Sequence, residues 1–124
     1  MKKVHTEKAP AAVGPYSQAI VSGNFVFASG QLGVDVGGAL EGDVATQTEN
    51  AIKNLSEVLL AAGSSLDGVV KTTCFLANIG DFAAFNEVYG KYFTGKPARS
   101  LIQAAALPKG SLVEIEAIAE IHKA

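Results

Sequence analysis

The chain has 124 residues, of which 48% are hydrophobic and 18% charged, and its formal net charge is −2. This apolar share can build a packed core and excludes a disordered chain, and the length fits one domain over residues 1–124. Lysine and arginine are scattered, which gives nucleic-acid binding no support, and no run of about 18 apolar residues could span a membrane. A single cysteine and a polar N-terminus without a signal-peptide core predict a cytoplasmic protein.

The first third of the chain predicts an irregular lead followed by a hairpin. Residues 1–15 contain two prolines and no clear period, so we expect no regular element there. Two short apolar runs, 18–21 and 25–29, are separated by Ser22-Gly23-Asn24, a tight-turn sequence that predicts a β-hairpin. The glycines scattered over residues 30–42 predict turns.

The middle of the chain predicts a helix, a strand and a second helix. Apolar residues recur at steps of three and four between Asp43 and Gly63, with Asp43 placed as N-cap and Gly63 as C-terminal cap. The β-branched run 69–77 predicts a buried strand. Asp81 is a candidate cap for the second helix, whose aromatic stripe we interpret as core packing: Phe82, Phe85, Tyr89, Tyr92 and Phe93.

The last third predicts two strands, 99–107 and 112–121, joined by a turn at residues 108–111. The element order is then β-β-α-β-α-β-β, an α/β (α+β) fold. Right-handed crossovers would place both helices on one face of a single mixed sheet. The other face would be bare, which indicates an oligomer.

Most familiar catalytic centres are absent from the sequence. His5 and His122 lie near opposite termini with no cluster of metal ligands around them, so we expect no metal site. The glycine-rich stretch matches neither a P-loop nor a dinucleotide fingerprint, and we expect no cofactor. Cys74 lies in a predicted buried strand and is interpreted as an inert core thiol.

Arg99 and Glu114 are the two charged residues whose positions ask for an explanation. An arginine that enters an apolar strand needs an anionic partner. That partner could be an internal glutamate such as Glu114 or Glu120, or the carboxylate of a ligand, which a guanidinium fork fits well. Glu114 could belong to a solvated strand face, or it could be partly buried at a subunit contact and act in proton transfer.

Three groups of residues together resemble signatures of the reactive-intermediate deaminase family, also called Rid or YjgF-like. The likeness runs over essentially the whole chain, in matching order and spacing. Its motifs are Gly14-Pro15-Tyr16-Ser17-Gln18 with Ser29-Gly30-Gln31, then Lys71-Thr72-Thr73 with Asp81-Phe82 and Asn86-Glu87-Val88-Tyr89, and finally Pro97-Ala98-Arg99-Ser100 with Leu107-Pro108-Lys109-Gly110 and Val113-Glu114-Ile115-Glu116-Ala117.

The resemblance implies a chorismate-mutase-like fold and a homotrimer with clefts between subunits. It also implies hydrolysis of 2-aminoacrylate and 2-iminobutanoate, which pyridoxal-phosphate-dependent dehydratases release, to 2-oxo acids and ammonia. By the same resemblance, Arg99 would bind the substrate carboxylate and Glu114 would position or activate water. The rest of the cleft would be lined by Tyr16, Ser29, Gly30 and Asn86.

The sequence departs from the family pattern at two places. Many members carry a cysteine where this chain has Leu101, which makes the expected cleft more apolar and removes a thiol that the mechanism does not use. The turn at residues 94–96 is shorter than in several relatives, which affects the cleft mouth and substrate preference.

Three other functions are compatible with parts of the sequence. The same cleft could hold a small carboxylic acid without turnover, as a regulatory module. A ribonuclease or translation-inhibitor activity, a label attached to some relatives, finds little support in the scattered basic residues. A chaperone-like role would need exposed apolar surface, which a trimer would bury.

Overall fold

The computed structural model describes residues 1–122 and contains one six-stranded mixed sheet. The order of strands across the sheet is β1-β2-β3-β6-β4-β5, with β4 and β5 parallel and every other neighbouring pair antiparallel. The strands are β1 (Lys2–Val4), β2 (Ala19–Ser22), β3 (Phe25–Leu32), β4 (Val69–Leu76), β5 (Ala98–Gln103) and β6 (Val113–Glu120).

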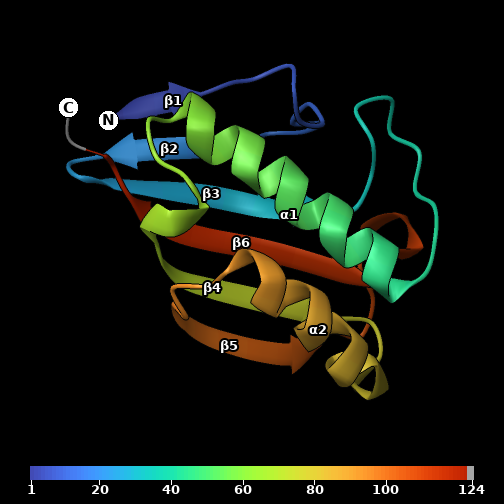
Figure 1. The fold of residues 1–124 in the computed structure, drawn as a ribbon. Coiled ribbons are helices and arrows are strands. Elements are labelled where there is room, and N and C mark those ends of the chain that lie inside the picture. The colour runs from blue at the N-terminus through green and yellow to red at the C-terminus, as the bar shows by residue number, and fades with distance from the viewer. Residues whose placement is uncertain (123–124) are drawn as a thin grey trace.

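Two helices, α1 (Val44–Ala61) and α2 (Phe82–Tyr92), cover the same face of the sheet (Figure 1). Three short 3₁₀ turns connect the elements: η1 (Leu66–Gly68), η2 (Ile79–Asp81) and η3 (Pro108–Gly110). The predicted one-sided arrangement is therefore confirmed. Its cause is the handedness of the two crossovers, β3-α1-β4 and β4-α2-β5.

The predicted caps occupy the expected positions at both helix starts, but only that of α1 makes a capping bond with its side chain. The Asp43 carboxylate accepts a hydrogen bond from the Thr46 amide at 3.0 Å, and Gly63 has a φ of +89°, a conformation suited to glycine after a helix. Asp81 makes no capping bond with its side chain. The side chain of Asn78 instead accepts from the Gly80 amide and stabilises the turn that leads into α2.

The sheet differs from the predicted one in three places. Residues 2–4 form an additional edge strand, β1, in a segment predicted to be irregular, so the order is β-β-β-α-β-α-β-β. Two lysines and one buried valine give this strand little apolar signal, although charge is typical of short edge strands. β3 continues to Leu32, past a bulge, and β5 ends at Gln103 instead of residue 107.

The two faces of the sheet have different surroundings. Alternate residues of β6 point towards the helices and are buried: Val113, Ile115, Ala117 and Ala119. The opposite face is uncovered and presents large apolar side chains, among them Phe25, Phe27, Val70 and Ile102. Single exposed apolar residues are ordinary, but a group on one sheet face is typical of a docking surface.

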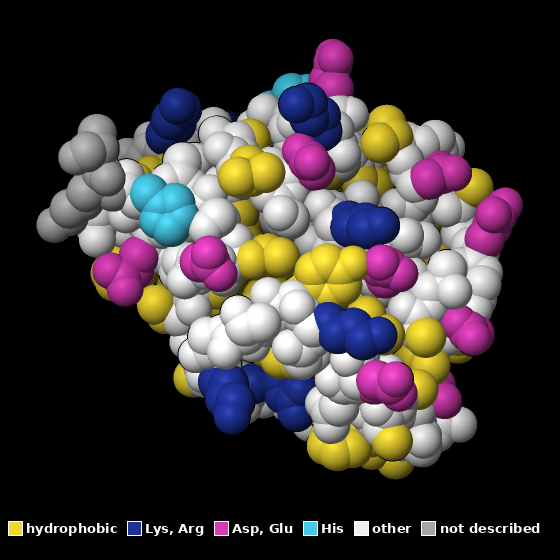
Figure 2. Space-filling model, in the orientation of Figure 1, with side chains coloured by type: hydrophobic (Ala, Val, Ile, Leu, Met, Phe, Trp, Pro, Cys, Tyr) yellow, Lys and Arg dark blue, Asp and Glu magenta, His cyan; other side chains and the backbone are white. Residues whose placement is uncertain are grey.

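The helix-covered face carries a mixture of acidic, basic and apolar side chains (Figure 2). A mixed surface of this kind creates no strong field of one sign. None of the helices in residues 1–122 combines the length and apolar character needed to cross a membrane.

Candidate functional site

Arg99 lies on β5 with its side chain on the helix-covered face, beneath α2. It stands directly opposite Thr72 of β4, a buried residue of that face, and neighbouring residues in register point the same way. Its Nη1 donates a hydrogen bond to the Asn86 side-chain oxygen at 2.7 Å. The guanidinium carbon also lies 4.9 Å from the centre of the Tyr89 ring.

Aromatic side chains of α2 therefore have a second role beyond the core packing predicted for them. Phe85 and Tyr89 are buried, as expected, whereas Phe82 is 44% exposed and is not a core residue. The centres of all three rings lie within 5.9 Å of the Arg99 guanidinium carbon. Cation–π contacts and the Asn86 bond restrict the arginine to one orientation. The ring of Tyr89 is itself held by a 2.7 Å hydrogen bond between its hydroxyl and that of Thr72.

Arg99 has no carboxylate partner within the described part of the chain. The ion pair found within residues 1–122 joins Lys53 and Glu49, 3.6 Å apart on the surface of α1, and does not involve Arg99. The internal pair with Glu114 or Glu120 is thus not formed. The arginine opens instead onto a hollow of about 440 Å³ that is bordered by Asn86, Gly90 and Pro97.

Glu114 lies on β6 with its side chain on the other face of the sheet. It stands between Leu32 of β3 and Phe75 of β4, and the carboxylate is half-buried. Burial raises the pKa of this carboxyl, and the nearby Glu116 carboxylate raises it further. A carboxyl group with a raised pKa is suited to proton transfer near neutral pH.

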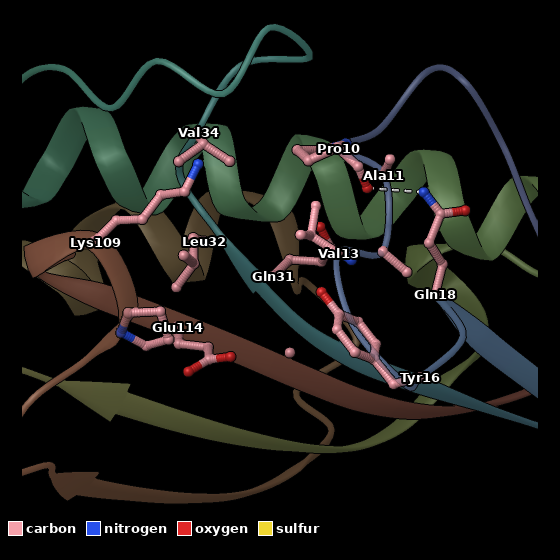
Figure 3. A pocket seen from close by; sticks show the side chains of 13 residues that line it. Pro10, Ala11, Val13, Tyr16, Gln18, Gln31, Leu32, Val34, Lys109 and Glu114 are labelled. Atoms are coloured by element: carbon pink, nitrogen blue, oxygen red, sulfur yellow. Dashed lines mark hydrogen bonds between the residues drawn. The ribbon is translucent and has the colours of Figure 1, made fainter.

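A cavity of about 380 Å³ lies beside Glu114. Figure 3 shows Tyr16, Val13 and Lys109 around the cavity, with Glu114 at its edge. Residues 10–13 form one wall, which is mostly apolar. The cavity thus combines one acidic group and one basic group with an otherwise largely apolar lining.

Gly30 makes room for the Glu114 side chain. Residues 29 and 30 form the bulge in β3, where these two residues lie opposite the single residue Glu116 of β6. A Cβ atom at position 30 would overlap the Glu114 carboxylate and would stand 2.8 Å from its carboxyl carbon. Any side chain here would displace the acid.

The remaining residues predicted for the site have separate positions. Tyr16 borders the Glu114 cavity and is 54% exposed. Ser29 borders neither of the two cavities; its hydroxyl donates to the Ser17 carbonyl at 2.6 Å, next to Tyr16. Asn86 belongs to the Arg99 hollow.

The predicted residues therefore fall into two groups within one chain. We call Arg99 and Asn86 the arginine half-site, and Tyr16, Gly30 and Glu114 the glutamate half-site. Their cavities share no lining residue, and Arg99 and Glu114 point to opposite faces of the sheet. Neither half-site alone combines a fork for a carboxylate with an acid for proton transfer.

Sequence reasoning missed two contributors to the glutamate half-site. Gln18 is buried beside the cavity, and Lys109 borders it in a left-handed conformation with φ of 59°. Both belong to the family motifs quoted above, but nothing in their local pattern distinguishes them from ordinary strand-end or turn residues. Among residues 1–122 no cluster of three or more histidine, cysteine, aspartate or glutamate side chains could hold a metal ion.

A single mixed sheet with two helices on one face defines a chorismate-mutase-like α+β protein. Residues 6–121 match the family described as Endoribonuclease L-PSP. The chain therefore belongs to this family, which is the reactive-intermediate deaminase (Rid, YjgF-like) family expected from the sequence motifs.

Two mammalian relatives are identical to this chain at about half of the aligned positions. It is 52% identical to the 2-iminobutanoate/2-iminopropanoate deaminase of Rattus norvegicus, over 95% of this chain and 88% of that protein. It is 50% identical to the Homo sapiens protein of the same name, over 94% of this chain and 87% of that protein.

Solved structures agree with the fold over almost the full length. TdcF of E. coli, crystallised with bound serine, is 39% identical with a TM-score of 0.94, covering 98% of this chain and 100% of that one. RidA from an Antarctic Psychrobacter is 46% identical with a TM-score of 0.94 and the same coverage.

Proposed function

We propose that the protein hydrolyses reactive 2-imino and 2-enamino acids, such as 2-iminobutanoate and 2-aminoacrylate, to 2-oxo acids and ammonia. An enamine first tautomerises to the imine, and water then adds to the C=N carbon. The carbinolamine that results loses ammonia as its C–N bond breaks and the C=O bond forms. The names of the rat and human relatives support this activity.

The arginine half-site supports the recognition of the substrate carboxylate. Arg99 has no acidic partner in the described chain, and its guanidinium is fixed by Asn86 and the α2 rings. A fixed, unneutralised guanidinium can bind a carboxylate through two parallel hydrogen bonds. We propose that it anchors the substrate and thereby sets the position of the imine carbon.

The glutamate half-site supports the proton transfers. Burial raises the pKa of Glu114 above its ordinary value, which makes the carboxylate a better proton acceptor. We propose that Glu114 positions the attacking water and takes its proton. The same proton can then leave with ammonia. Hydrolysis of an imine needs only water, orientation and these proton transfers, so the proposed mechanism uses no cofactor.

The observation that carries the proposal is the separation of Arg99 and Glu114 onto opposite faces of one sheet. A site that uses both must take them from two copies of the chain. The contact is heterologous, because the arginine half-site of one copy faces the glutamate half-site of the next copy. In a closed ring of copies, every half-site has a partner. We propose a homotrimer, in which the uncovered apolar sheet face is buried.

The proposed substrates are short-lived, so the enzyme must work where they arise. Dehydratases that use pyridoxal phosphate produce these imines from hydroxy amino acids. We propose that the protein acts beside such dehydratases in the cytoplasm.

The proposal is tested by generating 2-iminobutanoate in place from threonine and a threonine dehydratase, with semicarbazide to trap the surviving imine. Wild-type protein should speed the formation of 2-oxobutanoate. A charge-assisted contact contributes about 1.5–3 kcal/mol, and a bidentate one more, so Arg99→Ala should lower kcat/KM about 100-fold or further. Lys91→Ala, an exposed cation on α2 outside both cavities, is the matched control.

A second candidate function is carboxylate binding without turnover, and the serine bound to TdcF supports it. Glu114→Gln separates the two functions, because it retains the arginine half-site but removes the proton acceptor. Under the proposed function, this variant binds 2-oxobutanoate and no longer accelerates hydrolysis. A wild-type protein that binds 2-oxobutanoate and never accelerates its formation would favour the binding function instead.

A further inference from the structure

The Gln18 side chain is buried beside the glutamate half-site and makes hydrogen bonds with both ends of its amide. It is 2% exposed and precedes β2. Its Nε2 donates to the Thr6 carbonyl at 3.1 Å and to the Pro10 carbonyl at 2.9 Å, while its Oε1 accepts from the Thr6 amide at 2.7 Å. The bond to Pro10 is drawn in Figure 3. The reverse orientation of the amide would lose all three bonds, so its placement is well defined.

These bonds hold a segment that no strand pairing holds. β1 ends at Val4 and β2 begins at Ala19, and residues 10–13 between them form a wall of the cavity beside Glu114. Ala9 is buried and fixes one point of this segment. The Gln18 amide fixes the points on either side, at Thr6 and Pro10.

A second set of bonds holds the chain just after Tyr16. The Ser29 hydroxyl donates to the Ser17 carbonyl at 2.6 Å, and the Ser29 amide donates to the Gln18 carbonyl at 2.9 Å. Tyr16 therefore directly precedes two residues, Ser17 and Gln18, whose carbonyls are hydrogen-bonded to Ser29 in the β3 bulge. The Gln18 side chain and the Ser29 bonds together fix both ends of the segment that borders the cavity.

We infer that Gln18 is a positioning residue: its amide holds residues 10–13 as the wall of the Glu114 cavity, keeping water from the carboxylate and preserving the space for substrate. Its effect on turnover rests on the proposed function, while its effect on the surroundings of Glu114 does not. The other titratable groups that face this region are Tyr16, Lys109 of η3 and Glu116 of β6. None of the three Gln18 side-chain hydrogen bonds involves the side chain of one of these groups.

The direct test is a carbon-13 NMR titration of the Glu114 carboxyl, assigned by its absence in Glu114→Gln. In Gln18→Ala the wall loosens and the group becomes more hydrated, so its pKa should fall towards the ordinary carboxyl value. Exchange of the Thr6 amide hydrogen should also become faster. Gln18→Asn, whose side chain is too short to reach both carbonyls, is a milder variant that should change both readouts in the same direction.

The matched control is Ser64→Ala, which removes a buried hydrogen bond to the Glu120 carbonyl outside both cavities. Ser64→Ala should lower the stability of the fold about as much as Gln18→Ala does, but it should leave the Glu114 titration and the Thr6 amide exchange unchanged. In the imine assay, Gln18→Ala should lower kcat/KM about tenfold, and the acidic limb of its pH profile should move to lower pH.

The outcomes separate the two proposals. If wild-type protein fails to accelerate hydrolysis while the Gln18 variants shift the Glu114 titration, the proposed function fails and the positioning role stands. If folded Gln18→Ala and Gln18→Asn keep the wild-type titration and Thr6 exchange, the positioning role is wrong, whatever the activity.

Discussion

Arg99 and Glu114 point to opposite faces of the same sheet, although only one strand, β4, separates β5 from β6. Arg99 is paired with Thr72, and Glu114 with Phe75, three residues further along β4. Successive residues of a strand alternate between faces, so an odd offset places the two charged groups on different sides. This parity makes a single-chain site that uses both groups impossible without rearranging the sheet.

Asn86→Asp should act as an internal competitor for the substrate. The Asn86 oxygen accepts from Arg99 at 2.7 Å, so a carboxylate in its place would form an ion pair with the guanidinium. We expect KM to rise about tenfold with kcat changed less than about threefold, because the loss is in ground-state binding. Steady-state kinetics of the imine assay measure both. An unchanged KM would show that Arg99 does not bind the substrate.

Glu114→Gln should stabilise the fold at neutral pH. Burial raises the folded-state pKa of Glu114 above its unfolded value, so the folded protein holds this proton more tightly. Stability therefore falls as pH rises from about 4.3, the ordinary carboxyl value, through the folded pKa. Glutamine avoids that loss, so the variant should melt at a higher temperature than wild type at pH 7, and the difference should vanish near pH 3.

The control for this comparison is Glu116→Gln, since Glu116 is exposed and only the secondary cause of the shift. Its effect on the melting temperature should be smaller than that of Glu114→Gln. A Glu114→Gln variant that is less stable than wild type at pH 7 would show that burial does not outweigh the facing Arg99 of the neighbouring copy.

Cys74 should be unreactive in the native protein. The thiol is fully buried, and burial raises its pKa to about 11, so almost no thiolate forms at pH 8. We expect iodoacetamide to label the protein only after unfolding, as mass spectrometry would measure. Stoichiometric labelling of native protein at pH 8 would show that the strand around Cys74 opens readily.

Much of the fold was predictable because its signals are local. The period of α1 and its cap Asp43, and the alternation of β6, follow from neighbours in the sequence. β1 was not predictable, because a strand with two exposed lysines and one buried valine is held by pairing with β2. Asp81 stands at the predicted N-cap position of α2 but makes no side-chain capping bond, while Asn78 accepts a hydrogen bond in the turn before it.

The sequence pointed to some of the residues around the two cavities, but not to Gln18 or Lys109, and not to the geometry. Family motifs identified Arg99 and Glu114, but which face each occupies depends on strand register across β5, β4 and β6. The Gln18 bonds join residues up to 12 positions apart through a loop without periodicity, so no local pattern reveals them. The contact of Tyr89 with Arg99 likewise depends on how α2 packs over β5.

The central claim is that one site takes Arg99 from one copy of the chain and Glu114 from another. It is tested by co-refolding equal amounts of Arg99→Ala and Glu114→Gln, two variants that should each be inactive alone. In a randomly mixed trimer about a quarter of the clefts combine an intact Arg99 with an intact Glu114, so about a quarter of wild-type activity should return. Activity that stays at the level of the separate variants, in mixed trimers verified by native mass spectrometry, would contradict the shared site.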